Sequence, residues 1–206
     1  MVKYWIKNRF LLDLIVPCVL VLLVVFAFIT PMFNAIGEAT LMQSIYKNEK
    51  MDFLVQKVSE LGITKIVPVI TERTVVKIVD AKKEEKKQER WQKIALEACK
   101  QCGRSRIPEI TKAVKLKEAQ KYFSACDEKL VCYEEEKTQS IVKTVNKAKC
   151  LGYFIGPEGG ITEDEHKYLK EQGFVSVSLG KRILRAETAA IATGAIVLAL
   201  MGEMDV

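Results

Sequence analysis

The sequence predicts an α/β domain in which a mostly parallel sheet is flanked by helices. Short apolar runs of strand length alternate with longer segments whose apolar residues recur every three to four positions. Glycine follows several of these runs, which marks the ends of elements. This alternation is typical of successive parallel strands joined by helices that cover both faces of the sheet. At 206 residues, the chain has room for one such domain and a short appendage.

Residues 1–37 do not follow this pattern, so we divide the chain into an apolar N-terminal segment and a domain over residues 38–206. The segment Leu14–Ile29 contains sixteen residues and no charge. As a helix it would extend about 24 Å, whereas a bilayer core is about 30 Å thick. Three basic residues precede it, Lys3, Lys7 and Arg9, which is also typical of a signal peptide or signal anchor. Association with a membrane is therefore left open.

The domain is expected to begin with a short strand within Glu38–Tyr46. Apolar residues at positions 51, 54, 55, 58 and 61 then predict an amphipathic helix that ends at Gly62. Lys65–Ile70 is predicted as the next strand. A charged run at Lys82–Arg90 continues into an apolar stripe, and together they predict one long helix that ends at Gly103.

The middle of the chain predicts smaller elements. We expect a short helix over Leu116–Phe123, a strand over Leu130–Tyr133 and a polar helix over Thr138–Lys147. Leu151–Ile155 is a further apolar strand, and it is followed by the glycine-rich turn at residues 156–160.

The last part of the chain predicts a helix, a strand and a final helix. Thr162 and Glu165 have the spacing of a capping box, and Gly173 marks the end of the helix that they begin. Val175–Leu179 is the next strand. Thr188–Leu200 is apolar nearly all round, which indicates a helix buried against the sheet and against a partner subunit. The two glycine-bearing loops are expected to follow neighbouring strands, at the edge where open α/β sheets bind ligands.

Two motifs in these loops carry a resemblance to a known family. Gly156-Pro157-Glu158-Gly159-Gly160 and the segment LGKRILRAETA at residues 179–189 resemble the paired signature of RsmE-type 16S rRNA (uracil-N3)-methyltransferases of the SPOUT class. The segments KVSELGITKIVPVITER and EACKQCGR, which begin at Lys57 and Glu97, resemble that family too. The resemblance covers Leu41–Leu200. The PUA-like RNA-binding barrel with which the family usually begins is expected to be missing or replaced in residues 1–37.

The resemblance implies a trefoil-knotted SPOUT domain, a homodimer, a cytoplasmic location, and S-adenosyl-L-methionine (SAM) as methyl donor to a uridine of 16S rRNA in the small ribosomal subunit. It assigns the cofactor to both glycine loops and to the strand end near Tyr133. The implied cofactor residues are Tyr133, Ile155, Gly156, Glu158, Gly159, Gly160, Leu179, Gly180, Ile183, Leu184 and Arg185. A valine in place of Gly159 is expected to abolish cofactor binding because it would fill space that the backbone needs.

Proton removal from uracil N3 calls for a base or a stabilising cation, and the catalytic residues that we expect are Arg185 and Glu187. The same two side chains could instead form a local ion pair, and Glu158 could instead cap the following helix. Arg73, Arg104 and Arg106 lie in loops and are the predicted RNA-binding residues. A formal net charge of +6 suits a polyanionic partner.

Other chemistries find less support. The glycine loop lacks the lysine and hydroxyl of a P-loop and the spacing of a dinucleotide fingerprint. No nucleophile, base and orienting residue can be assembled around the only histidine, His166, which we expect to be a solvated helix residue. Cys99 and Cys102 lack further ligands nearby, so no metal site is predicted. Two alternatives to the methyltransferase remain: a truncated SPOUT protein that binds cofactor or RNA without this catalysis, and a membrane-anchored protein held by residues 14–29.

Overall fold

The computed structural model describes residues 37–46, 48–75, 80–146 and 148–204. The predicted apolar span Leu14–Ile29 lies outside these residues. In the part of the chain that the structure describes, no helix combines the length and the apolar composition that crossing a bilayer requires.

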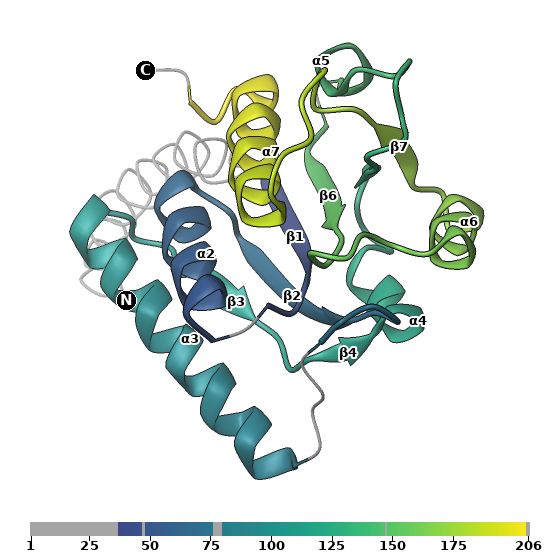
Figure 1. Cartoon of the computed structure of the whole chain (residues 1–206). Helices are drawn as coiled ribbons and strands as arrows, with labels where there is room; N and C mark the ends of the chain where they lie inside the picture. Colours follow the sequence, from purple (N-terminus) through teal and green to yellow (C-terminus); the bar gives the residue numbers. More distant parts are fainter. Residues whose placement is uncertain (1–36, 47, 76–79, 147, 205–206) are drawn as a thin grey trace, which may run out of the picture. The chain divides into compact units, whose positions relative to one another are not determined.

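A seven-stranded sheet forms the centre of the described domain, and every strand pairing in it is parallel. Its path runs in the order β3-β2-β1-β6-β5-β7, with β4 also paired to β2 (Figure 1). The strands are β1 (Glu38–Ser44), β2 (Lys65–Ile70), β3 (Glu109–Ile110), β4 (Val114–Lys115), β5 (Glu128–Cys132), β6 (Cys150–Ile155) and β7 (Val175–Val177). The prediction of a parallel α/β sheet is confirmed, although the two-residue strands β3 and β4 were not predicted.

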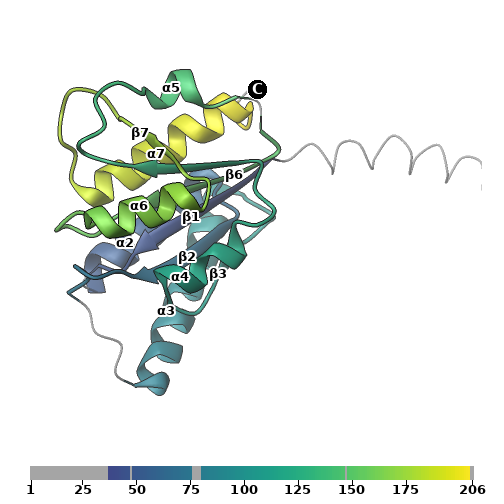
Figure 2. The same ribbon diagram turned by 90° about the vertical axis from the view of Figure 1, so that its right-hand side faces the viewer.

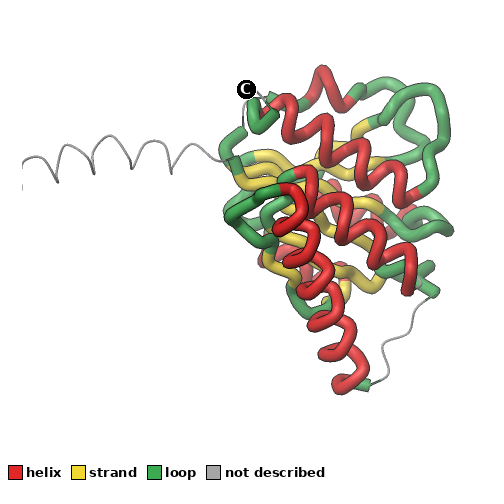
Figure 3. The backbone as a smooth tube through the Cα atoms, turned by 90° about the vertical axis from the view of Figure 1, so that its left-hand side faces the viewer, coloured by secondary structure: helices red, strands yellow, loops and turns green. Residues whose placement is uncertain are grey.

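Helices cover both faces of the sheet. They are α2 (Asn48–Leu61), α3 (Ala81–Cys102), α4 (Leu116–Ala119) with a following 3-10 turn (Gln120–Tyr122), α5 (Ile141–Thr144), α6 (Glu163–Glu171) and α7 (Ala186–Met201). Residues of α2, α3, α5 and α7 share one buried core with the sheet, and residues of α4 and α6 share the other. Figure 2 views the face that carries α4 and α6, and Figure 3 shows the long helices side by side on the opposite face.

One predicted helix is much shorter than expected. The polar helix predicted over Thr138–Lys147 is reduced to the single turn α5. Residues before it are held in an extended path, because the Glu136 carboxylate accepts hydrogen bonds from the amides of Thr138 and Gln139. The Gln139 carbonyl in turn accepts from the Ser178 amide. These side-chain and long-range bonds replace the amide bonds that a longer helix would need.

The expectation that the two glycine loops follow neighbouring strands was wrong, because β5 lies between β6 and β7. The three strands nevertheless end in register. Cys132 of β5 pairs with Ile155 of β6 on one side and with Val177 of β7 on the other. Since parallel strands end at the same edge of a sheet, the loops after β5, β6 and β7 all leave from one place.

The last helix returns from β7 to pack against β1, β6 and α2. Gly194 allows its close approach to the sheet: a Cβ atom there would lie 2.8 Å from the Tyr153 hydroxyl, which donates to the Ala190 carbonyl. The other face of α7 stays at least partly exposed, although it is almost entirely apolar; it carries Ile191, Ala192, Ala195 and Ala199. The sheet therefore buries one face of the predicted apolar helix, and burial of the second face against a partner subunit stays a prediction. The knot that the resemblance implies stays a prediction.

Candidate functional site

A cavity of about 1040 Å³ lies at the carboxyl ends of β5, β6 and β7. Its walls are the three loops that follow these strands, the first turn of α7, and Lys50 from the start of α2. Cavities that bind small molecules and cofactors measure roughly 300–1,000 Å³. This one is large enough for a ligand the size of a nucleoside with an amino-acid substituent.

The structure brings the predicted cofactor and catalytic residues together around this cavity, with one exception. The predicted cofactor residues that line it are Tyr133, Ile155, Gly156, Glu158, Gly160, Leu179, Gly180, Ile183, Leu184 and Arg185. Both predicted catalytic residues, Arg185 and Glu187, line it as well.

Gly159 is the exception, since it is absent from the cavity wall. Its carbonyl accepts a hydrogen bond from Arg73 at 2.9 Å. A Cβ atom at Gly159 would meet the Arg73 side chain at 3.6 Å, which is ordinary van der Waals contact. The expected effect of a valine there loses its physical reason, because the space beside Gly159 faces Arg73 and not the cavity.

Two other glycines are required by the turns that they make. Gly160 has φ +71°, and a Cβ atom there would lie 2.9 Å from the Glu134 carboxylate. Gly180 has φ +108° with no atom near its missing Cβ. Left-handed backbone of this kind strains any residue with a side chain. Gly160 is thus fixed by both backbone and packing, whereas Gly180 is fixed by its backbone alone.

A cluster of charges lies on the α7 side of the cavity. The Lys50 ammonium pairs with the Glu158 carboxylate and lies 3.9 Å from Glu187 Oε1. Glu187 Oε2 is buried and has no hydrogen-bond partner in the described structure. The alternative of a local ion pair between Arg185 and Glu187 is not found among the described contacts, because Glu187 pairs with Lys50. Glu158 does not cap α6 either, since the cap is the predicted capping box of Thr162 and Glu165.

Two other ionisable groups beside the cavity stay neutral at physiological pH. Burial, reinforced by the nearby carboxylates, raises the pKa of the Tyr46 phenol, whose hydroxyl donates to the Gly156 carbonyl at 3.4 Å. Burial raises the pKa of the Cys132 thiol to about 12. A phenol and a thiol held neutral in this way are poor proton acceptors. Glu187 is left as the proton acceptor that lines the cavity, with Oε1 beside Lys50 and Oε2 without a hydrogen-bond partner among the described residues.

The wall formed by the loop after β5 is fixed by two contacts. Hydrogen bonds from the Thr138 hydroxyl and from two backbone amides hold the pKa of Glu136 down to about 2. Tyr133 stacks on His166, with ring centroids 3.9 Å apart. His166 also makes a 2.7 Å hydrogen bond to the Ser176 hydroxyl, so the expectation of a merely solvated histidine was wrong. In the sequence, only the position of His166 ten residues before Ser176, across a predicted turn, could have indicated this hydrogen bond.

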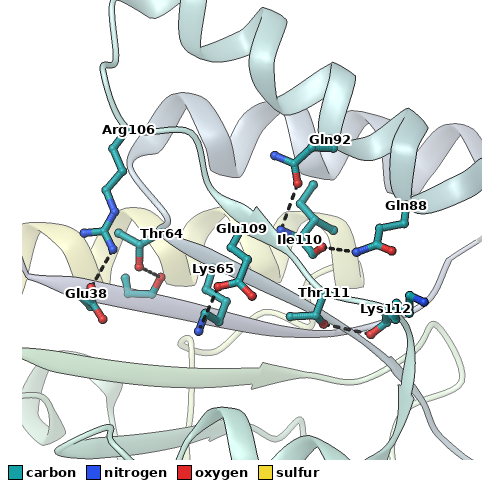
Figure 4. A network of polar contacts seen from close by, with 11 residues as sticks. Glu38, Thr64, Lys65, Gln88, Gln92, Arg106, Glu109, Ile110, Thr111 and Lys112 are labelled. Atoms are coloured by element: carbon teal, nitrogen blue, oxygen red, sulfur yellow. Dashed lines mark hydrogen bonds and ion pairs between the residues drawn. The ribbon is translucent and has the colours of Figure 1, made fainter. Parts of the chain in front are cut away.

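The three arginines predicted to bind RNA lie in different places. Arg104 donates to the carbonyls of Gly62 and Ile63, at 3.0 and 3.2 Å, and to that of Ser59, so it caps the end of α2. Arg106 pairs with Glu38 at the first residue of β1 (Figure 4). These contacts place both at the amino edge of the sheet, opposite the cavity. Of the three, only Arg73 lies at the carboxyl edge beside the cavity, and the contacts of Arg104 and Arg106 account for these two side chains without RNA.

Within the described ranges, no three His, Cys, Asp or Glu side chains come together as possible metal ligands. Cys99 is buried, and its thiol donates to the Arg106 carbonyl. Cys102 is exposed, and its thiol donates to the Cys99 carbonyl. These two cysteines therefore belong to the end of α3.

Known proteins resemble the chain in both sequence and fold. The ribosomal RNA small subunit methyltransferase E of Bacillus subtilis is 39% identical over 150 residues, which cover 69% of this chain and 58% of that protein. Its counterpart in Aquifex aeolicus is 37% identical over 169 residues, which cover 78% and 68%. The chain spans about three fifths of the length of the Bacillus relative.

Solved structures agree with this relationship. A ribosomal RNA small subunit methyltransferase E from Neisseria gonorrhoeae, bound to SAM, matches with a TM-score of 0.71 and 36% identity over 80% of this chain and 66% of that one. The protein Lpg2936 from Legionella pneumophila, also in complex with SAM, matches with a TM-score of 0.75 over 80% of this chain and 66% of that one. The fold is thus a SPOUT-type methyltransferase fold. A family model described as an RNA methyltransferase domain matches residues 34–198, and the chain belongs to that RNA methyltransferase domain family.

Proposed function

We propose that this protein transfers a methyl group from SAM to N3 of a uridine in 16S ribosomal RNA of the small subunit. The observation that carries the proposal is the joining of both glycine-bearing motifs around one cavity at the ends of three parallel strands. The relatives from Bacillus subtilis and Neisseria gonorrhoeae, 39% and 36% identical to this chain, are small-subunit rRNA methyltransferases, and the second was solved with SAM bound.

The cavity suits the chemistry of SAM. Its lining includes the apolar residues Ile155 and Leu179, which suit an adenine ring, and the open space beside Gly180, with no atom within 4 Å of its missing Cβ, lets a ligand approach the backbone. When bound, SAM supplies a methyl group already activated on a sulfonium. The chain then has only to hold donor and acceptor in line, exclude water and receive the proton of N3. We assign the proton to Glu187, and the stabilisation of negative charge on the base to Arg185.

RNA binding is assigned to the carboxyl edge of the sheet. Arg73 is exposed there, and its guanidinium donates a hydrogen bond to the Gly159 carbonyl, beside the loop that lines the cavity. A guanidinium at this place can hold a phosphate close to a base that enters the cavity. A base must leave its stack or come from a single strand to present N3, so the target is expected in a loop or a flipped nucleotide.

We also propose that the protein acts as a homodimer in the cytoplasm. The support is the partly exposed apolar face of α7, which carries Ile191, Ala192, Ala195 and Ala199. Small side chains along a helix permit a close approach of a second copy, and a continuous apolar surface of this kind is more typical of an interface than of a free surface.

The test is a calorimetric titration of the purified protein with SAM, followed by transfer of labelled methyl to 30S particles from a strain that lacks the modification. We expect binding of one SAM per chain and a single new methyluridine by mass spectrometry. Binding without transfer to 30S particles or to free rRNA would favour the alternative of a SPOUT protein that holds the cofactor without this reaction. No SAM binding would overturn the proposal.

A further inference from the structure

The charges on the α7 side of the cavity form an ordered pair of a cation and an anion. Lys50 comes from the start of α2, and Glu187 comes from the first turn of α7, far apart in the chain but 3.9 Å apart at Nζ and Oε1. The Glu187 side chain is 17% exposed, whereas that of Lys50 is 45% exposed. The carboxylate therefore lies at the base of the wall with its ammonium partner beside it, nearer to solvent.

The pair is incomplete as it stands. Glu187 Oε2 is buried without a hydrogen-bond partner in the described structure, and an unsatisfied buried acceptor is costly. Lys50 keeps its place through its ion pair with Glu158, which also raises its pKa, so the ammonium stays charged. Three further groups interact with the pair: the Tyr46 phenol with Glu187, and the Glu158 carboxylate and the Arg185 guanidinium with Lys50.

The Glu187 carboxylate is a hydrogen-bond acceptor and the Lys50 ammonium a donor, and such a pair is complementary to one edge of uracil. That edge presents an N3–H donor between two carbonyl acceptors, whereas cytosine presents a lone pair at N3 beside an amino donor. A carboxylate on N3 and an ammonium on the neighbouring carbonyl satisfy uracil and repel cytosine. Sites built from buried polar groups can reject a mismatched partner by large factors, because the groups are left unpaired.

We propose that Lys50 and Glu187 together read the imide edge of the target base, with Lys50 on a carbonyl oxygen and the Glu187 carboxylate on N3–H. This inference rests on the proposed function and adds Lys50, which sequence reasoning did not identify as a site residue. In the reaction the N3–H bond breaks and its proton goes to Glu187. The nitrogen forms the new N–CH3 bond, and the electron pair of the broken S–CH3 bond stays on sulfur. Lys50 stabilises the charge that develops on the carbonyl oxygen.

The first test measures binding without catalysis. Saturation-transfer NMR on the full chain loaded with SAM compares uridine monophosphate with cytidine monophosphate. We expect a preference for uridine in the wild type that is lost in Glu187→Gln and in Lys50→Met. The matched control is Lys167→Met, an exposed lysine of α6 outside the cavity wall, which keeps the preference. Equal binding of both nucleotides by the SAM-loaded wild type would overturn the inference and leave SAM binding itself untouched.

The second test measures methyl transfer to 30S particles as a function of pH. Loss of a general base lowers rates by about 10²–10⁴-fold, so we expect Glu187→Gln to fall in that range and its residual rate to climb with pH as the solution ionises N3–H. Lys50→Met should lose about 10- to 100-fold, with partial recovery in Lys50→Arg. If wild type transfers methyl and both variants keep its rate and pH profile, the inference fails while the proposed function stands. If wild type binds SAM and prefers uridine but transfers no methyl, the proposed function fails while the reading of the imide edge stands.

Discussion

The rings of Tyr133 and His166 stack with centroids 3.9 Å apart and planes 18° apart. Tyr133 forms part of the cavity wall, and His166 belongs to α6 on the other side of it. The histidine is fixed in turn by Ser176 at 2.7 Å. This chain of contacts links a helix with no residue in the predicted site to the wall of the cavity.

The stack predicts how stability depends on pH. Burial, with the nearby Lys170, lowers the pKa of His166 from its usual 6.5. The folded state therefore holds fewer protons than the unfolded state, so this contribution to stability is present above pH 6.5 and is lost as pH falls through the lower, folded value. Because the chain has one histidine, its titration can be followed as a single imidazole signal by NMR. A midpoint at or above 6.5 would contradict the prediction, and His166→Gln should flatten the pH dependence of the melting temperature in this window.

Glu136 should determine the order of the loop that it caps. Glu136→Ala removes the acceptor of three hydrogen bonds, which come from the Thr138 amide, the Thr138 hydroxyl and the Gln139 amide. We expect SAM affinity to fall by about tenfold, because the loop that lines the cavity loses the cap that orders it. Since the pKa of Glu136 lies at about 2, its contribution is complete above pH 4.5 and is lost only as pH falls toward 2. An unchanged affinity in calorimetry would show that the loop keeps its shape without this cap; Glu171→Gln, on the exposed end of α6, is the control.

Arg104 and Arg73 should separate stability from RNA binding. Arg104→Ala leaves three carbonyls at the end of α2 without their donor, and we expect it to lower the free energy of unfolding by about 2 kcal/mol. Its RNA affinity should be unchanged. Arg73→Ala should do the reverse, with a salt dependence of RNA binding that is less steep by about one unit. Urea unfolding and filter binding over a range of salt measure the two effects, and a loss of RNA affinity in Arg104→Ala would restore that residue to the RNA-binding set.

Glycine substitutions should distinguish the two turns at the cavity from Gly159. Gly180→Ala places a side chain at φ +108°, where the strain costs about 1–3 kcal/mol, so the loop should rearrange and SAM affinity should fall at least about fivefold. Gly159→Ala makes only ordinary contact with Arg73 and should bind SAM as the wild type does. Calorimetric titration of both variants with SAM measures the two affinities, and an equal loss of affinity in both would place Gly159 in the cofactor site.

A charge on the outer face of α7 should separate the proposed dimer. Ala195 is partly exposed near the middle of that face, and Ala195→Glu would bury a carboxylate at a two-fold interface without a partner. We expect a monomer by light scattering, while Lys143→Glu on α5 should leave the mass unchanged. A wild type that is already monomeric at micromolar concentration would refute the dimer.

The alternation of apolar runs and glycines was enough to obtain the order of the elements and the glycine loops as the site. The apolar runs identify the strands because strands such as β2 and β6 are buried on both faces, and their sequences are therefore apolar along most of their length. The capping box of α6 was found for the same kind of reason, since Thr162 and Glu165 act within one helical turn.

Everything that depends on partners distant in the chain had to come from the folded molecule. Only tertiary structure puts β5 between β6 and β7, sets Lys50 beside Glu187 across 137 positions, and brings Arg104 to the end of α2. Charged and polar side chains carry no periodic signal of their own, so their roles follow from the groups that the fold brings within a few ångströms of them.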